Sequence, residues 1–262
     1  MDISLTQTKT TNSLLFFVVQ QVRAAIFPLF IFFILGITLI IDLPILARYD
    51  WLLLFCVAMQ FFMVKTNLES VDELKVITVF HFIGLVMEIF KVNMGSWSYP
   101  EEGIFKVFNV PLFSGFMYAS VASYLCQFWR IFDVRLIQWP SLKIAVPLAA
   151  MIYLNFFMHH YIWDFRWILF GAVAVVFFRA KLSFRIRQSL IQIPIIAYFF
   201  LIGLLIWIGE NIATLLGAWH YPNQSNGWEL VHIGKISSWL LLVIVSFLIV
   251  ANLKVVKDRI KS

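Results

Sequence analysis

Long apolar segments alternate with short polar ones along the whole chain, and this pattern predicts a bundle of membrane-spanning helices. Several of these segments reach the length of about 20 residues that an α-helix needs to cross about 30 Å of hydrocarbon. Two others are shorter, but their flanking basic side chains can extend to the headgroups, so they too are expected to span. Eight helices are expected, at 24–42, 50–65, 75–93, 109–129, 144–163, 165–179, 189–213 and 236–253.

The first apolar segment differs from the others. Residues 13–23 are apolar but are interrupted by Gln20, Gln21 and Arg23, and residues 1–12 before them are polar. This arrangement favours an N-terminal tail followed by a helix that lies in the membrane interface. No small-residue cleavage site follows, so no cleavable signal is expected. If residues 13–23 crossed the membrane instead, the number of spans would change.

Composition supports a membrane protein and excludes several other classes. Of the 262 residues, 62% are apolar and 13% carry a charge, whereas about a quarter of the residues of a soluble domain are charged. A soluble enzyme, a nucleic-acid-binding protein and a disordered chain are therefore excluded. The predicted fold class is an all-α polytopic membrane protein. Cys56 and Cys126 lie within apolar segments and are expected to be buried thiols.

The distribution of basic residues predicts the orientation. In the eight-helix arrangement, fifteen of the 20 Lys and Arg residues lie on the side that carries both termini. Because cytoplasmic loops carry the excess of Lys and Arg, both termini are expected in the cytoplasm. The localisation expected from this arrangement is the plasma (inner) membrane, with multiple passes.

A five-position pattern occurs twice in the chain. The pattern is E-x6-G-x-W-x-Y-P, and the second copy begins 122 residues after the first. The two copies are Glu88, Gly95, Trp97, Tyr99, Pro100 and Glu210, Gly217, Trp219, Tyr221, Pro222. A second match by chance at all five positions is expected on the order of 10⁻⁵ times, so an internal duplication explains it better.

The duplication predicts how the chain is divided. After the tail and interfacial helix at 1–23, a first four-helix repeat is expected at 24–135 and a second at 136–262. An even number of helices per repeat means that both repeats insert in the same direction. They would then be related by a pseudo-two-fold axis along the membrane normal.

The two repeated glutamates are the candidate catalytic residues. Glu88 and Glu210 each lie seven residues before the turn glycine, which places them about 10 Å below the loop along a helix. Ionisable groups within a membrane are costly and indicate function. The alternative is structural: each glutamate would accept hydrogen bonds from the Trp and Tyr of its own loop and hold that loop against the helix.

Further polar and aromatic residues are expected near the same face of the membrane. The candidate substrate-binding residues are Trp97, Tyr99, Trp219, Tyr221, His81, Asn155, His159, His160 and Asp164. The aromatic residues could instead anchor the interface, and His81 could be a core residue. No ligand spacing such as HxxxH is present, so no metal is predicted, and the cofactor is left open.

Three sequence blocks carry a resemblance to a known family. The blocks MEIFKVNMGSWSYP, VPLFSGFMYASVASY and YLNFFMHHYIWDFRW resemble domain-of-unknown-function family 817, a bacterial integral-membrane family. The resemblance covers nearly the whole chain. It implies a membrane protein and implies no particular activity.

A looser resemblance is to the membrane domains of lycopene cyclases and carotenoid hydratases. Those domains also pair an intramembrane acid with a downstream W-x-Y or Y-x-Y and a proline at the next helix start, which here correspond to Glu88, Trp97, Tyr99 and Pro111. The resemblance implies protonation of a polyene. The chain departs from that family directly after the proline, where it has Leu112 in place of an acid.

Three functions are compatible with these features. The first is an enzyme that acts on an isoprenoid or another lipid in the bilayer, with Glu88 or Glu210 as general acid and the Trp and Tyr π-faces stabilising positive charge. The second is a proton-coupled transporter of a small solute. The third is a non-catalytic membrane component that assembles with a protein partner. The lipid bilayer is the expected environment, and no nucleic-acid partner is expected.

Overall fold

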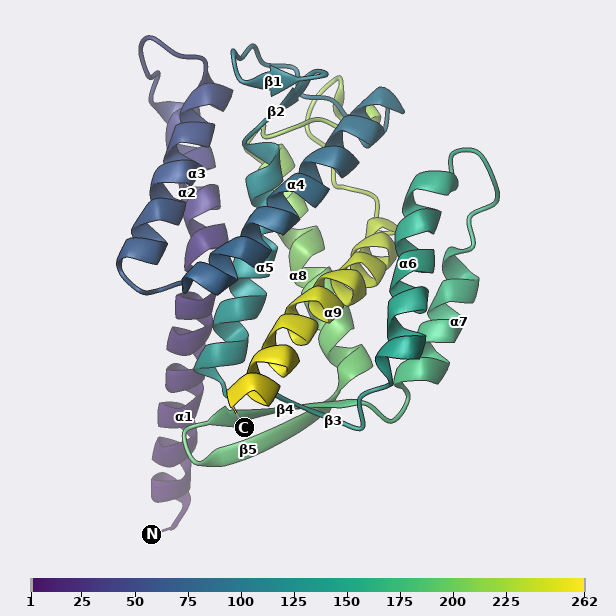
Figure 1. The fold of residues 1–262 in the computed structure, drawn as a ribbon. Helices are drawn as coiled ribbons and strands as arrows, with labels where there is room; N and C mark the ends of the chain where they lie inside the picture. The colour runs from purple at the N-terminus through teal and green to yellow at the C-terminus, as the bar shows by residue number, and fades with distance from the viewer. Residues whose placement is uncertain (1, 262) are drawn as a thin grey trace.

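The computed structural model describes the backbone of residues 2–261 and the side chains of residues 13–252. It is mostly helical, with short strands at both ends of the molecule (Figure 1). The helices in this described part are α1 (Asp2–Ala24), α2 (Ile26–Ile40), α3 (Arg48–Lys65), α4 (Val71–Asn93), α5 (Ser114–Ile131), α6 (Leu142–Met158), α7 (Arg166–Phe177), α8 (Ile195–Leu215) and α9 (Lys235–Lys261).

Each of the eight predicted segments contains a helix, but several helix ends differ from the prediction. The segment 189–213 begins with a strand, and α8 starts only at Ile195. The segment 109–129 begins with a short hairpin, and α5 starts at Ser114. The segment 144–163 ends early, because α6 stops at Met158, so His159 and His160 follow the helix instead of belonging to it.

The prediction of a wholly helical fold was wrong at both ends of the molecule. A short hairpin joins β1 (Lys106–Val107) to β2 (Val110–Pro111), and an antiparallel sheet joins β3 (Arg135–Ile137), β4 (Lys181–Ile186) and β5 (Ser189–Pro194). In this sheet Leu182 lies opposite Ile193 and Phe184 opposite Ile191. Such apolar cross-strand pairs stabilise the sheet. We call the two ends of the molecule the β1–β2 end and the β3–β5 end.

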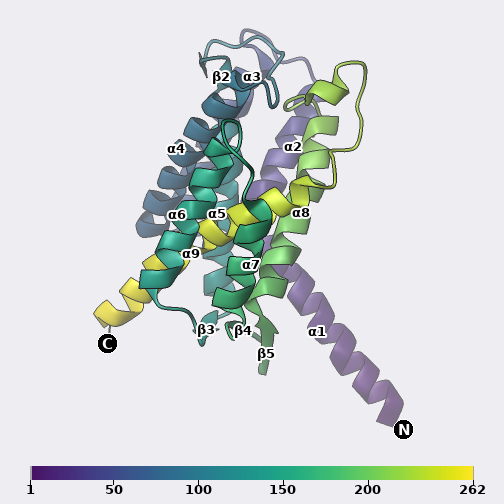
Figure 2. The ribbon, with the colours of Figure 1, turned by 90° about the vertical axis from the view of Figure 1, so that its right-hand side faces the viewer.

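Some of the helices are long and apolar enough to cross a membrane. In the described part of the chain these are α4, α8 and the first 18 residues of α9. Residues Ser13–Ala24 and Ile26–Ile40 are long and apolar enough to cross a membrane only when taken together, and the two segments are bent by 68° relative to each other. Figure 2 shows α1 leaving the bundle. Helices α6 and α7 are apolar but shorter. The chain is therefore a membrane protein, whereas eight crossings and an interfacial position for residues 13–23 stay predictions.

The helices form two groups of similar construction. Helix α4 packs along α5 and α8 packs along α9, while α5 and α9 also contact each other. Helix α2 covers α5 and carries α3 beside it, and α6 covers α9 and carries α7 beside it (Figures 1 and 2). The helices of the second group begin 116 to 124 residues after their counterparts in the first. The ends of α4 at Asn93 and of α8 at Leu215 differ by 122 residues.

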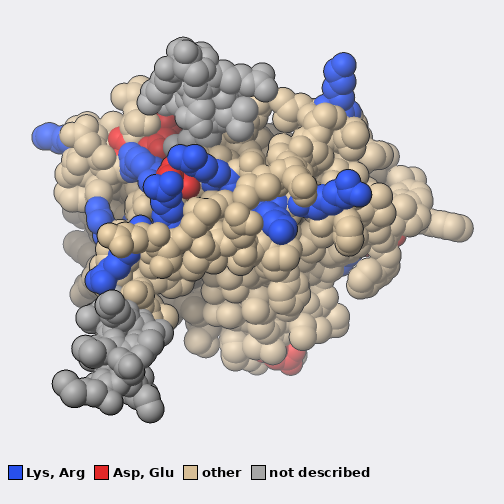
Figure 3. All heavy atoms as spheres, turned by 90° about the horizontal axis from the view of Figure 1, so that it is seen from below, with Lys and Arg blue, Asp and Glu red and all other residues tan. Residues whose placement is uncertain are grey.

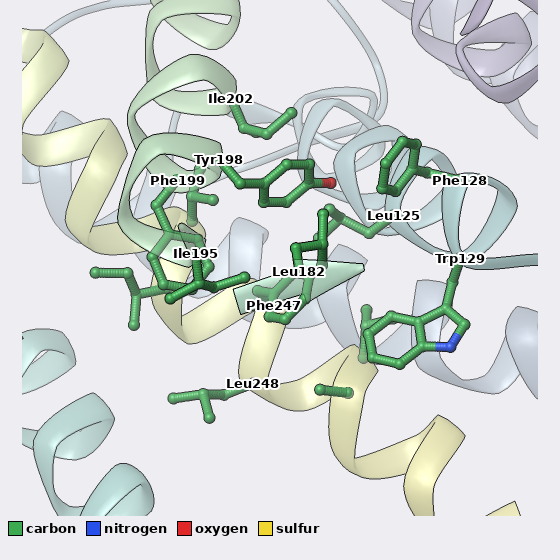
Figure 4. Close-up of a cluster of buried hydrophobic side chains, with 14 of the residues drawn as sticks. Leu125, Phe128, Trp129, Leu182, Ile195, Tyr198, Phe199, Ile202, Phe247 and Leu248 are labelled. Atoms are coloured by element: carbon green, nitrogen blue, oxygen red, sulfur yellow. The ribbon is translucent and has the colours of Figure 1, made fainter. Parts of the chain in front are cut away.

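Aromatic side chains fill the core toward the β3–β5 end. The ring of Phe128 on α5 stacks on Tyr198 of α8 with 5.4 Å between centroids, and Phe247 of α9 lies 5.7 Å from Tyr198. Leu182 of β4 lies among these side chains (Figure 4). A second core lies between α2, α3 and α5 and extends to the loops of the β1–β2 end. The two cores hold the polar residues of the loops in fixed positions.

Basic side chains are spread over the β3–β5 end. The view of this face shows many Lys and Arg side chains and few acidic ones (Figure 3). Arg135, Lys181, Arg185 and Arg187 are exposed residues of the sheet and its turn. The sequence-based charge count also includes Lys9, Lys254, Lys257, Arg259 and Lys261, whose side chains lie outside the described residues. Both ends of the chain emerge at this same end of the molecule (Figure 1).

One arginine at the β1–β2 end connects the two groups of helices. The Arg48 guanidinium donates to Glu101 at 2.6 Å and to the carbonyl of Leu216, just after α8, at 2.6 Å. It also donates to Thr38 at 3.1 Å and to the carbonyl of Leu35 at 3.0 Å. The last carbonyls of a helix have no partner within the helix. Arg48 satisfies such a carbonyl after α8 and at the same time bonds a carbonyl within α2, and its planar fork of donors allows both contacts where the single ammonium of a lysine does not.

Replacing Arg48 with Lys should therefore destabilise the protein strongly, although the substitution conserves the charge. We expect a loss of about 2–3 kcal/mol, because several charge-assisted hydrogen bonds are lost at a largely buried site. Thermal unfolding in detergent measures it. Arg135→Lys is the matched control, since Arg135 is 68% exposed and makes only a 3.5 Å ion pair. Equal melting temperatures for the two variants would contradict this role of Arg48.

Candidate functional site

The first repeated motif folds into a cluster around Glu88. Helix α4 ends at Asn93, and Gly95 follows with φ of 70°, a left-handed conformation that suits glycine. The chain then turns back, so that Trp97 Nε1 and Tyr99 Oη donate to Glu88 Oε2 at 2.6 and 2.7 Å. Tyr118 of α5 donates to Glu88 Oε1 at 2.7 Å. Three fixed donors therefore satisfy a carboxyl group that is only 3% exposed.

The second motif folds in the same way around Glu210, with one difference. Gly217 again has φ of 70°, and Tyr221 Oη donates to Glu210 Oε1. Among the described residues no hydrogen bond joins Trp219 to Glu210. Trp239 of α9 instead donates to Glu210 Oε2 at 2.7 Å. The sequence analysis offered, as its structural alternative, hydrogen bonds to each glutamate from the Trp and Tyr of its own loop. Three of these four contacts are present: Trp97 and Tyr99 to Glu88, and Tyr221 to Glu210.

The two clusters meet at the β1–β2 end. Ser98 and His220 exchange two backbone hydrogen bonds of 2.9 Å, and these residues are themselves 122 positions apart. The rings of Trp97 and Tyr221 lie 5.9 Å apart at their centroids. The Lys235 ammonium lies over both rings, 5.1 Å from the centroid of Trp97 and 4.6 Å from that of Tyr221. Equivalent positions of the two motifs therefore come together in one site.

The loop tyrosines of this site are held in their neutral form. Burial raises the pKa of Tyr99 well above its usual value, and the Glu88 carboxylate beside it adds to this effect. Burial likewise raises the pKa of Tyr221, with a further contribution from Glu210. A neutral phenol keeps its proton for donation. Both tyrosines therefore act as hydrogen-bond donors to the glutamates at any physiological pH.

An apolar cavity of about 310 Å³ lies next to both glutamates. Its walls come from α2, α5 and α8, with Glu88, Glu210 and the rings of Trp97, Tyr118, Trp219, Tyr221 and Trp239 on one side. The other lining residues are mostly aliphatic or aromatic. Leu29 and Leu205, which also line the cavity, are 45% and 50% exposed on the surface of the helices. Its volume is within the range of small-molecule sites.

His81 lies away from the glutamate cluster. Its ring packs on Phe116 with 4.5 Å between centroids, and its Nδ1 is buried with no hydrogen-bond partner among the described residues. A side chain at Gly115 would come within 2.7 Å of that Nδ1, so the glycine leaves room for the ring. These contacts favour the interpretation of His81 as a core residue.

The other predicted residues form a separate group beyond α6. Asn155 donates to Asp164 Oδ1 at 3.0 Å, and Asp164 pairs with Arg166 at 3.0 Å. His159 and His160 lie beside Lys91 of α4. None of these residues lines the cavity next to the glutamates. In the described part of the chain, no three His, Cys, Asp or Glu side chains converge in a way that could hold a metal ion.

Four residues of these sites were missed in the sequence. Lys91 lies three residues after Glu88, and a lysine near a helix end is usually interpreted as an interface anchor. Tyr118 and Trp239 were not recognised as a repeated pair because they are 121 positions apart and the repeat offset is 122. Lys235 was counted only as a loop charge. A search for paired aromatic residues near the repeat offset would have found Tyr118 and Trp239.

The left-handed glycines allow a test of whether the two motifs are equally important for folding. Gly95→Ala and Gly217→Ala should each cost about 1–2 kcal/mol, because an alanine is strained at φ of 70°. Thermal unfolding of each variant gives the comparison. Gly36→Ala is the control, since Gly36 lies in α2 with no atoms near its Cβ position, and it should be neutral or stabilising. A cost at only one of the two motifs would contradict their equivalence.

The chain belongs to the family described as "Protein of unknown function (DUF817)", whose profile matches residues 13–247. A relative in Bacillus subtilis (strain 168), named "Uncharacterized protein YoaT", is 60% identical over 240 residues, which are 92% of this chain and 91% of that protein. The resemblance of the three sequence blocks to this family is thus confirmed.

Two solved structures are similar in fold. A crystal structure of a cross-linked MvINS trimer has a TM-score of 0.50 and 12% sequence identity, and covers 71% of this chain and 95% of that one. A structure of MvINS, described as a mycobacterial Insig homolog from Mycobacterium vanbaalenii, has a TM-score of 0.49 and 12% identity, with 70% and 93% covered. At this identity the first of these likenesses concerns the fold alone.

Proposed function

We propose that this protein binds an isoprenoid or another lipid inside the bilayer and acts on it with an intramembrane glutamate as proton donor. The observation that carries the proposal is the apolar cavity between α2, α5 and α8, whose two carboxyl groups are those of Glu88 and Glu210. Apolar walls with a few convergent polar groups are typical of small-molecule sites. Leu29 and Leu205, exposed on the helix surface, supply an apolar entrance from the lipid.

Of the two glutamates, Glu210 is the better candidate for the acid. Glu88 already accepts hydrogen bonds from three donors on two elements, which suits a fixed carboxylate. Glu210 accepts from Tyr221 and Trp239 only, so it retains more freedom to carry a proton and turn it toward the cavity. The division of roles would be a structural Glu88 and a reactive Glu210.

The chemistry would be protonation of a carbon–carbon double bond. The carboxyl O–H bond breaks as a C–H bond forms, which leaves a carbocation and a carboxylate. The neighbouring π-faces would stabilise the cation. Lys235 over Trp97 and Tyr221 is an example of a cation held by these rings. Return of a proton from carbon to the carboxylate would complete an isomerisation or a cyclisation. Addition of water, with the extra proton of the oxonium ion returned to the carboxylate, would complete a hydration.

We also infer that the two groups of four helices are parallel repeats that cross the membrane eight times in total, with both termini in the cytoplasm of a bacterial cell. The matching offsets of the elements and the pairing of Ser98 with His220 support the repeat. The basic β3–β5 end, where both ends of the chain emerge, supports the orientation. The glutamates would then lie toward the outer leaflet of the plasma membrane.

Filling the cavity should abolish lipid retention. Ala213 of α8 is 3% exposed and lines the cavity, so Ala213→Leu places bulk where the lipid would lie. After gentle detergent extraction, mass spectrometry of the organic extract should find a defined lipid with the wild-type protein and only background with this variant. Ala174→Leu is the matched control, because Ala174 is exposed on α7 away from the cavity. Equal lipid with both variants, or none with the wild type, would count against the proposal.

Glu210→Gln should keep the lipid but change its identity. Glutamine preserves the shape of the side chain and cannot act as an acid, so the unreacted lipid should accumulate, since general acids contribute about 10²–10⁴-fold to rates. Chromatography with mass spectrometry would detect the unreacted lipid, either as an isomer with a different retention time or as a species whose mass differs by that of one water molecule. Glu88→Gln should mainly lower the melting temperature. Identical lipid in wild type and Glu210→Gln would reject acid chemistry and leave lipid binding alone.

A further inference from the structure

A buried lysine without an acidic partner lies at the β1–β2 end, outside the cavity described above. Lys91 of α4 is 3% exposed. Its Nζ lies 2.9 Å from His160 Nε2 and 3.4 Å from His159 Nε2. The Phe156 ring of α6 covers it at 4.1 Å from the centroid. Among the ion pairs of the described residues none includes Lys91. A buried ammonium group with only neutral partners is a costly arrangement.

The two histidines act as neutral acceptors for this lysine. His159 Nδ1 lies 3.1 Å from the carbonyl oxygen of Asn155, which can only accept, so Nδ1 carries the proton and Nε2 is left as an acceptor. The rings of His159 and His160 lie 4.2 Å apart. Both rings are half-buried and directly follow the end of α6.

The charges around this group are mainly positive. Arg166 at the start of α7 and Lys235 at the start of α9 are close enough to act on Lys91 electrostatically. Asp164 is the nearby acid, and both of its oxygens are occupied: Oδ1 accepts from Asn155 and from the Arg166 backbone, and Oδ2 pairs with the Arg166 guanidinium. Asp164 thus also acts on Lys91 from a distance, but among the described residues no carboxylate forms an ion pair with Lys91.

A small apolar hollow, called here the groove below Lys91, lies about one helical turn from Lys91 along α4. Ile83 and Met87 of α4, Tyr153 of α6, and Trp239 and Leu242 of α9 line an apolar hollow of about 50 Å³. Met87 precedes Lys91 by four residues, so the two side chains lie on the same face of α4. Lys91 therefore places a positive group among apolar side chains, which is complementary to the anionic head of an amphiphile.

We propose that Lys91, His159 and His160 bind a tetrahedral oxyanion of the phosphate type at the β1–β2 end. The anion replaces the neutral imidazoles as acceptor for the Lys91 ammonium, because a charged acceptor forms the stronger hydrogen bond. Next to the anion the histidines take up a proton from water at Nε2 and donate from it, while the His159 Nδ1–H group stays bonded to the Asn155 carbonyl. The position of Lys91 on a helix that is apolar enough to cross a membrane, under the Phe156 ring, favours a lipid headgroup as the source of the oxyanion over a free anion. This site is independent of the proposed lipid chemistry at Glu210.

Binding measurements on the full-length protein in an uncharged detergent test the site. The probes are inorganic phosphate, a short-chain phosphatidic acid and the matching diacylglycerol, titrated by calorimetry. Wild-type protein should bind the phosphatidic acid, and Lys91→Met should weaken this binding at least about tenfold, equivalent to about 1.4 kcal/mol. Lys75→Met is the matched control, since the Lys75 side chain is 73% exposed and lies at the opposite end of α4, and it should bind as the wild type does.

The probes separate the two sources of the oxyanion. Much tighter binding of phosphatidic acid than of inorganic phosphate identifies a lipid headgroup as the ligand. Equal binding of the two identifies a free oxyanion. Either result supports the site if the Lys91→Met substitution removes the binding. If Lys91→Met does not fold, His160→Leu, at a half-buried ring, should show the same loss. The proposal is overturned if neither phosphate probe binds, if diacylglycerol binds as well as phosphatidic acid, or if the folded variants bind as the wild type does.

Discussion

The arrangement of this protein depends on satisfying two carboxyl groups within an apolar helix bundle. An unpaired polar group in such surroundings costs several kcal/mol by any estimate. Glu88 and Glu210 avoid this cost because each loop turns back at a left-handed glycine and brings a tyrosine to the carboxyl group. The position of each loop is thereby determined, and with it the meeting of Ser98 and His220 that joins the two halves.

The two halves share a plan, but their differences create the candidate site. Glu88 takes its third donor from Tyr118, whereas Glu210 takes its second from Trp239, a residue at a slightly different offset and of a different type. Arg48 joins the first half to the end of α8. If the halves were identical, neither glutamate would be favoured for chemistry. The unequal donor sets leave one carboxyl group firmly held and the other with more freedom next to the cavity.

The cavity beside the glutamates and the groove below Lys91 share part of their walls. Tyr118 and Trp239 line both hollows, and these are the side chains that donate to Glu88 and Glu210 from the neighbouring helices. A rotation of either ring that joined the two spaces would break a hydrogen bond to a glutamate. The wall between the two hollows is therefore held in place by these hydrogen bonds to the glutamates.

The sequence by itself determined that this is a helical membrane protein, and it offered, as one of two interpretations, the pairing of Glu88 with Trp97 and Tyr99 and of Glu210 with Tyr221. Hydrophobic length and a repeated local pattern are one-dimensional properties, so they can be recognised without a structure. Only the tertiary structure decided that Tyr118 and Trp239 complete the clusters, that Lys91 meets His159 and His160, and that residues 189–194 extend a sheet. These contacts join segments distant in the chain, and their partners depend on how the helices pack and not on any local spacing.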